Sequence, residues 1–222
     1  MALTRCLPGR VAICHLSGGR RWPRASETCR LGNLLSPMDL VQPREPYLAS
    51  YVEALTRGWS SDSSRGPVAA VEELERIKLD AGAFLASMDD REARGPPINL
   101  PDGSTAERLP GFQRWMWDGE FAGSIGLRWR PGTTDLPDYC LGHIGYGVVP
   151  WKQRRGYATR ALSLILPLAK QEGLAFVEIT TDVANLPSQQ VILANGGVLV
   201  EQFIKPAAFG SKPGFRYRIR LA

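Results

Sequence analysis

The feature that most constrains the fold is a strand–helix–strand succession in the second half of the chain. CLGHIGYGVV (140–149) is predicted to be a strand that Pro150 ends, and GYATRALSLILPLAKQEG (156–173) has the apolar spacing of a helix. LAFVEITTDV (174–183) is an almost continuous apolar run, which is typical of a strand buried on both faces. Two strands joined by a helix in this way predict a βαβ crossover within a mixed α/β sheet.

The remaining elements surround this crossover. Helices are expected over residues 46–59, from Pro67 to about Met88, and over 185–194, and strands over 38–43, 112–129, 198–204 and 214–221. Asp118-Gly119 predicts a hairpin turn within 112–129, and the Pro- and Gly-rich residues 94–111 predict a long loop. Pro167 is expected to kink or shorten its helix, and Gly173 to end it. The predicted fold class is a mixed, mostly antiparallel sheet flanked by helices, with a central βαβ crossover.

Charge separates the chain into two parts. The net charge is +5, with 27 basic and 22 acidic residues, and residues 1–37 hold six arginines against one glutamate. Residues 38–222 are therefore electrically balanced. We expect residues 1–37 to be a basic, disordered extension, with Met38 as the physiological start, and residues 38–222 to form a single domain. A neutral domain argues against nucleic acid as its partner.

Three of the four cysteines, Cys6, Cys14 and Cys29, lie in the extension, and only Cys140 lies in the predicted domain. An internal disulfide is therefore excluded there, and the cysteine spacings fit no common zinc site, so we expect no metal. The lack of a possible disulfide in the domain also favours a reducing, cytoplasmic location. No run of 18 apolar residues is present, so we expect no membrane partner.

The stretch PWKQRRGYATRAL (150–162) lies at the junction of a strand and a helix, and Lys152, Arg154 and Arg155 crowd it. The first N–H groups of a helix lack internal partners, and together with the helix dipole they attract phosphate. Gly156 and Ala158 would allow a diphosphate to approach the backbone. A tight turn that happens to be basic is the alternative interpretation.

Two spaced motifs resemble those of the GNAT superfamily of N-acetyltransferases, in particular a bacterial group of predicted acetyltransferases. VVPWKQRRGYATRAL resembles its Q/R-x-x-G-x-G/A motif, which binds acetyl-CoA, through Gln153, Gly156 and Ala158. NLPSQQVILANGG resembles a second segment, through Asn185 and Ser188.

The resemblance implies a site for coenzyme A. Strand 142–149 would splay from strand 175–181, and the pantetheine arm would pair in the gap. A main-chain N–H at Val148 would polarise the thioester carbonyl, with Val149 beside it. Asn185 would bond the pantetheine arm, and Ser188 would order the helix start or the cofactor. The cradle of the pyrophosphate would consist of Gln153, Arg154, Arg155, Gly156, Tyr157, Ala158 and Thr159.

The resemblance also implies direct attack of an amine on acetyl-CoA, which requires a base because an alkyl ammonium has a pKa near about 10.4. The family often has a glutamate where this chain has Gly142, so the neighbouring His143 is the candidate base, unless its side chain points away. Glu120 and Glu178 are the alternatives. Where the family often has a thiolate-protonating tyrosine, this chain has Ile192. Either Tyr146 or Tyr217 would replace it, or the thiolate would leave unprotonated or take a proton from water.

The leading interpretation is an acetyl-CoA-dependent N-acetyltransferase acting on a primary amine of a small molecule or a protein. The alternatives are a catalytically weak module that binds or senses acyl-CoA, and a nucleic-acid-associated protein that uses the arginines of residues 1–37. The final strand, GFRYRIRL, is expected at the sheet edge, where it would permit a homodimer.

Overall fold

The computed structural model describes residues 38–62, 65–100 and 103–221, all within one compact unit that spans Leu35–Ala222. The predicted extension over residues 1–37 lies outside the described residues. The helices are α1 (Glu45–Thr56), α2 (Pro67–Leu79), α3 (Ala81–Ala86), α4 (Tyr157–Gln171) and α5 (Leu186–Ala194), with single 3-10 turns at Pro150–Lys152 and Ala207–Phe209.

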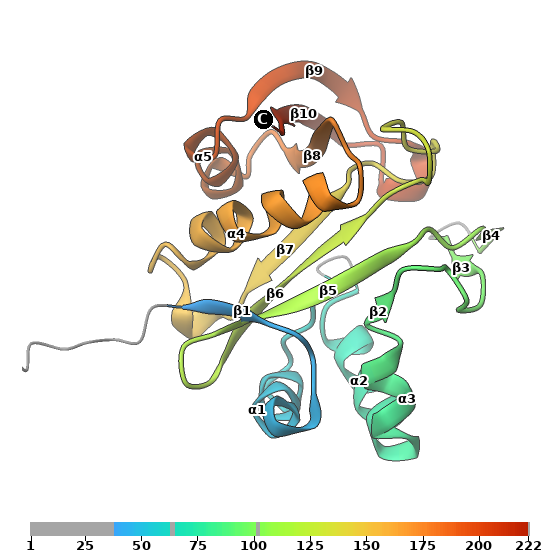
Figure 1. Ribbon diagram of the computed structural model, residues 1–222, viewed down its shortest axis with the longest axis vertical. Helices are drawn as coiled ribbons and strands as arrows, with labels where there is room; N and C mark the ends of the chain where they lie inside the picture. Colours follow the sequence, from blue (N-terminus) through green and yellow to red (C-terminus); the bar gives the residue numbers. More distant parts are fainter. Residues whose placement is uncertain (1–37, 63–64, 101–102, 222) are drawn as a thin grey trace, which may run out of the picture. The chain divides into compact units, whose positions relative to one another are not determined.

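The strands form two main sheets and one small hairpin (Figure 1). The first sheet has the order β1-β5-β6-β7, with β2 also paired to β5, and the second has the order β8-β10-β9. All of the pairings are antiparallel. The strands are β1 (Asp39–Val41), β2 (Asp89–Asp90), β3 (Ile98–Asn99), β4 (Thr105–Ala106), β5 (Gly111–Trp117), β6 (Phe121–Arg128), β7 (Ile144–Val148), β8 (Phe176–Asp182), β9 (Val198–Ile204) and β10 (Pro213–Arg220).

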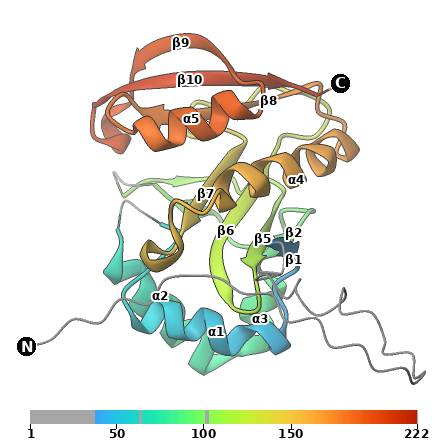
Figure 2. The same cartoon turned by 90° about the vertical axis from the view of Figure 1, so that its left-hand side faces the viewer.

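The expected crossover β7-α4-β8 is present, but its two strands belong to different sheets. β7 is the last strand of the first sheet, β8 is an edge of the second, and α4 runs between them (Figure 2). The buried face of α4 consists of Ala161, Leu162, Ile165 and Ala169, as its apolar spacing predicted. The mixed α/β fold, with mostly antiparallel strands flanked by helices, is thereby confirmed.

Helices cover both faces of the first sheet. The α4 side holds Met116, Ile125 and Leu127 in one apolar core, and the α1 side holds Trp115 and Phe121 in another. Along β5 this division follows from the alternation of side chains, which separates Trp115 from Met116. Along β6 the register shifts between Met116 and Trp117 of its partner strand, and Phe121 therefore lies on the opposite face from Ile125 and Leu127. β5 and β6 extend past the apolar core around α1 at their ends that carry Gln113 and Arg128. At these ends the sheet lines an open cavity.

Two local predictions need correction, namely a single helix from Pro67 to about Met88 and an edge position for the final strand. The helix predicted from Pro67 to about Met88 is broken at Asp80, which is extended and whose side chain accepts a hydrogen bond from the N–H of Ala83. Pro167 lies inside α4, which continues to Gln171 before Gly173 turns the chain with φ +85°. The final strand β10 is central, and the two edges of this sheet are β8 and β9.

Among the described residues, no helix is long and apolar enough to cross a membrane.

Candidate functional site

The loop between β7 and α4 has the geometry of an anion cradle. Arg154 and Gly156 both have left-handed backbones, with φ +63° and +76°, and Gly156 is the N-cap of α4 without any side-chain cap. Within the described residues, the backbone N–H groups of residues 154–159 have no hydrogen-bond acceptor, and the first helical amide with a partner is that of Arg160. Successive unpartnered amides at a helix start can bind a diphosphate.

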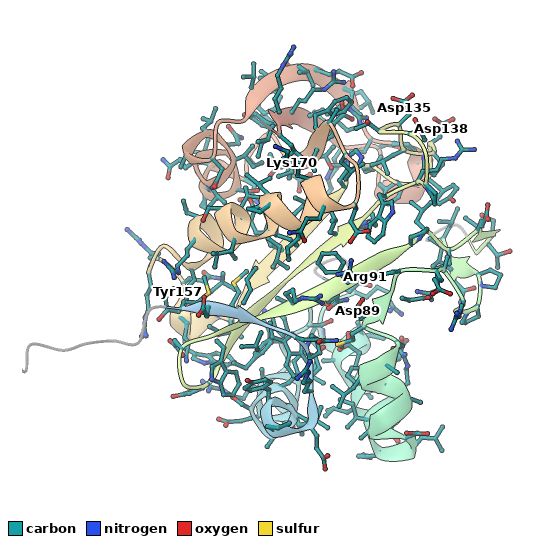
Figure 3. The ribbon with its side chains drawn as sticks, in the orientation of Figure 1. Asp89, Arg91, Asp135, Asp138, Tyr157 and Lys170 are labelled. Carbon is teal, nitrogen blue, oxygen red and sulfur yellow. The ribbon has the colours of Figure 1, made fainter. Side chains whose placement is uncertain are left out.

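Lys152 does not belong to this cradle, although its charge helped to suggest the cradle. Its side chain is only 7% exposed, and its Nζ lies 2.5 Å from Asp118 Oδ1. Tyr157, labelled in Figure 3 at the start of α4, donates its hydroxyl to the other oxygen of Asp118 at 2.6 Å. Asp118, in the turn between β5 and β6, therefore holds both ends of the cradle loop. Arg154 and Arg155 are the exposed cations of the loop.

Burial raises the pKa of Asp118, but the hydrogen bonds from Lys152 and Tyr157 outweigh burial, so the net pKa is lowered. The carboxylate is thus charged at neutral pH.

The main-chain groups of β7 alternate between the first sheet and the gap that separates β7 from β8. Arg128 N–H donates to His143 C=O at 2.9 Å, and Val149 N–H donates to Ala122 C=O at 3.0 Å. Because these bonds alternate along an antiparallel pair, the main-chain groups of Ile144, Tyr146 and Val148 face away from β6, toward β8. The amide of Val149, also predicted to serve the cofactor, is instead used within the sheet. Gln153 Nε2 donates to Val148 C=O at 3.2 Å and so holds the end of β7.

His143 connects the two strands instead of serving as a base. Its side chain is buried, with the residue only 1% exposed. Nδ1 accepts from Glu178 N–H at 2.9 Å, and Nε2 lies 3.0 Å from Thr134 C=O. The proton must therefore be on Nε2, and no lone pair is left for a substrate. Burial lowers the pKa of His143 despite the bond to Thr134, which acts in the opposite direction.

Neither alternative carboxylate is poised as a base. The carboxylate of Glu178 is mostly buried and accepts hydrogen bonds from Arg216 at 2.9 Å and Arg218 at 2.7 Å. Burial raises its pKa, but these two arginines outweigh burial and lower it. Glu120 is exposed beside Lys152.

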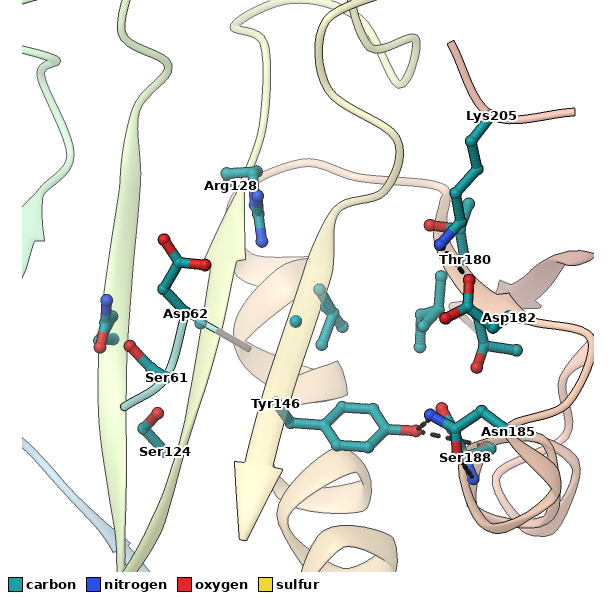
Figure 4. Close-up of a pocket in the computed structure, with 16 residues that line it drawn as sticks. Ser61, Asp62, Ser124, Arg128, Tyr146, Thr180, Asp182, Asn185, Ser188 and Lys205 are labelled. Atoms are coloured by element: carbon teal, nitrogen blue, oxygen red, sulfur yellow. Dashed lines mark hydrogen bonds and ion pairs between the residues drawn. The ribbon is translucent and has the colours of Figure 1, made fainter. Parts of the chain in front are cut away.

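Tyr146 spans the gap to α5. Its hydroxyl lies 2.9 Å from Ser188 Oγ (Figure 4). Asn185 is the N-cap of α5, and its Oδ1 accepts a hydrogen bond from Ser188 N–H at 3.1 Å. Burial raises the pKa of Tyr146, although the bond to Ser188 opposes the shift, so its phenol is protonated and able to donate. Tyr217 lies in the apolar core near Gln189 and does not line the cavity.

A polar cavity of about 440 Å³ opens along this gap and extends over β5 and β6 (Figure 4). Sequence reasoning found Tyr146, Asn185 and Ser188 among its lining residues, which the structure brings together. It missed Asp62, which lies in the loop between α1 and α2. It also missed polar lining residues on the two sheets and directly after β9, among them Gln113, Ser124, Arg128, Thr181 and Lys205. Strand alternation could have placed Gln113, Ser124 and Arg128 on one face, but no sequence pattern marks that face as a cavity.

Comparison with known families gives a match to the acetyltransferase (GNAT) domain over residues 74–198, more than half of the chain. The match includes the cradle, the gap and α5. Comparison with curated proteins gave no significant match.

Solved structures of low sequence identity share the fold. RimL, a ribosomal L7/L12 alpha-N-protein acetyltransferase in complex with coenzyme A, has a TM-score of 0.54 at 13% identity, over 84% of this chain and 96% of that one. A Salmonella typhimurium acetyl transferase that modifies the N-terminal serine of L7/L12 scores 0.53 at 13% identity, over 83% and 95%. The microcin C7 self-immunity acetyltransferase MccE, in complex with acetyl-CoA and AMP, scores 0.51 at 14% identity, over 82% and 92%.

Proposed function

Because the chain belongs to the GNAT family of acetyltransferases, we propose that it transfers the acetyl group of acetyl-CoA directly to a primary amine of a small molecule or a protein. The observation that carries the proposal is the alignment of three features along one path. These are the unpartnered amides of residues 154–159, the edge of β7 that faces the gap, and the polar cavity beyond it.

In this proposal the cradle binds the pyrophosphate of acetyl-CoA. The exposed Arg154 and Arg155 add positive charge at the cradle, and the backbone of Gly156 allows close approach because a Cβ there would meet no atom within 4 Å. The pantetheine arm pairs with the free main-chain groups of β7. The thioester carbonyl then accepts a hydrogen bond from Val148 N–H, which stabilises the negative charge that develops on its oxygen.

The transfer forms one C–N bond and breaks one C–S bond. The neutral amine attacks the carbonyl carbon, the coenzyme A thiolate leaves, and the nitrogen gives up its extra proton. We assign Tyr146 as the donor that protonates the thiolate, because its hydroxyl lies in the gap and is protonated at neutral pH. Ser188 is the positioning residue that orients this hydroxyl.

The base that deprotonates the attacking ammonium is sought among the carboxylates of the cavity. Asp182 and Asp62 lie on opposite walls, and both are ion-paired, Asp182 with Lys205 and Asp62 with Arg65 Nε at 2.8 Å. We favour Asp62, acting directly or through water, because its loop lies over the sheet face onto which the cavity opens.

A cytoplasmic location is expected for this enzyme.

The test is thiol release from acetyl-CoA by the full chain against a panel of amines, amino acids and peptides. Two similar structures are enzymes that acetylate L7/L12, so the N-terminal peptide of that protein belongs in the panel. Release with one acceptor class supports the transferase. Tight binding of coenzyme A without release supports the weak acyl-CoA-binding module instead, and absence of binding contradicts both.

A further inference from the structure

The floor of the cavity is made of two glycines. Gly126 on β6 and Gly145 on β7 are register partners, and both line the cavity. A Cβ added to Gly145 would lie 3.0 Å from Arg128 Nη2. The sheet is therefore bare of side chains at this point, and the guanidinium of Arg128 lies next to the bare floor. Figure 4 shows Arg128 and Tyr146 on the strands that border this cavity.

Two buried polar atoms in the lining of the cavity lack hydrogen-bond partners. Gln113 Oε1 and Thr181 Oγ1 are buried without a hydrogen-bond partner, and both residues line the cavity. Thr181 is 5% exposed. A buried polar atom without a partner destabilises the fold, so such atoms mark places where a ligand can supply the missing hydrogen bond.

Among the described residues, Arg128 is the charged side chain of this lining that has no ion pair. Asp182 pairs with Lys205, and Asp62 pairs with Arg65. The described residues provide neither a hydrogen-bond acceptor nor an ion-pair partner for the guanidinium of Arg128. A guanidinium presents a planar set of donors that matches a carboxylate, which it binds through two parallel hydrogen bonds.

We propose that the acceptor is an amino acid whose reactive amine is separated from its carboxylate by several carbon atoms, with the carboxylate held by Arg128. This inference rests on the proposed function, which places the reacting amine near Val148 N–H. Val148 follows Gly145 by three residues, a distance of about 10 Å along a strand. In an α-amino acid the amine lies too close to the carboxylate for one to bind Arg128 while the other reaches the thioester. In a linear ω-amino acid the two groups are far enough apart.

The spacing is tested with the full chain, acetyl-CoA and a series of ω-amino acids from glycine to 6-aminohexanoate, each paired with its carboxamide. We expect kcat/KM to rise with chain length and to fall at least about tenfold when the carboxylate of the longer members becomes an amide, since a charge-assisted pair is lost. Equal rates for acids and amides, or a best acceptor as short as glycine, would overturn the proposal.

Arg128→Gln is the decisive variant. It should lower kcat/KM at least about tenfold for 6-aminohexanoate but leave the rate with its amide and the affinity for coenzyme A unchanged. Arg130→Gln is the matched control, because Arg130 is a nearby exposed arginine that does not line the cavity. An equal loss for acid and amide would show that Arg128 has only a structural role.

A binding measurement separates the inference from the proposed function. If coenzyme A binds but no amine is acetylated, the transferase proposal fails, and the carboxylate site is judged by thermal shift with 6-aminohexanoate in the presence of coenzyme A. A shift that Arg128→Gln abolishes and Arg130→Gln retains supports the site. The absence of a shift in the parent protein overturns it.

Discussion

At the scale of single residues, the charge of a side chain predicts its role only when its partners are known. Lys152, Arg154 and Arg155 are adjacent in sequence, yet Lys152 is buried against Asp118 and only the two arginines are exposed. His143 was attractive as a base because it is the only histidine of residues 38–222. Its two ring nitrogens are instead both bonded to main-chain atoms, which no local pattern reveals.

Gly156 offers a test of the cradle at this scale. Gly156→Asp and Gly156→Asn have the same size, and both side chains tolerate the left-handed backbone that φ +76° requires. They differ by one negative charge placed against the pyrophosphate. We expect calorimetry to show coenzyme A binding at least about tenfold weaker for Asp than for Asn, with a difference that shrinks as salt is added. Equal affinities would exclude the cradle assignment.

At the scale of elements, the hairpin β5-β6 and the cradle loop act as one unit because Asp118 bonds both Lys152 and Tyr157. The hairpin at Asp118-Gly119 was predicted from sequence, and the cradle loop from its glycine and basic residues. The contact between the turn at Asp118 and the cradle loop is a tertiary contact, because more than thirty residues separate Asp118 from Lys152 in the chain. Local sequence patterns therefore do not predict it.

Asp118→Asn should destabilise the fold by about 3 kcal/mol, because it leaves the buried Lys152 with only the exposed Glu120 as a partner. Since the folded pKa of Asp118 is lowered, its contribution is present above the unfolded value and is lost as pH falls through the folded value. Denaturant melts between pH 7 and pH 3 should therefore show a smaller acid loss for the variant. The double variant Asp118→Asn, Lys152→Met should recover part of the stability, and failure to recover would contradict the ion-pair account.

At the scale of the whole molecule, two sheets diverge from one junction, where His143 N–H donates to Glu178 C=O at 2.8 Å and the imidazole accepts in return. The gap between β7 and β8 opens beyond this junction. Gly142 allows the approach, because a Cβ there would lie 3.0 Å from Glu178 C=O. The junction thus determines where the substrate gap begins.

His143→Asn tests this role. Because burial lowers the folded pKa of His143 below its unfolded value, the protonated form is disfavoured in the fold, and stability should fall as pH drops from 7 to 5. The variant should show less of this pH dependence. At pH 7 its free energy of unfolding should be lower than that of the parent protein by about 1–3 kcal/mol, because buried hydrogen bonds are lost. Coenzyme A affinity at pH 7 should persist once the variant is folded. A pH profile of stability identical to that of the parent protein would refute the assignment.

The sequence by itself determined the elements whose signals are local. The apolar run of β8, the spacing along α4, the turn at Asp118-Gly119 and the two motifs around Gly156 and Asn185 depend on neighbours within a few residues. Tertiary structure alone decided which strand lies at the edge of the second sheet, that Lys152 and His143 are structural, and that Gly126, Gly145 and Arg128 meet in one cavity. The physical reason is that burial and pairing depend on residues distant in the chain, and these contacts determine which polar groups remain free for a ligand.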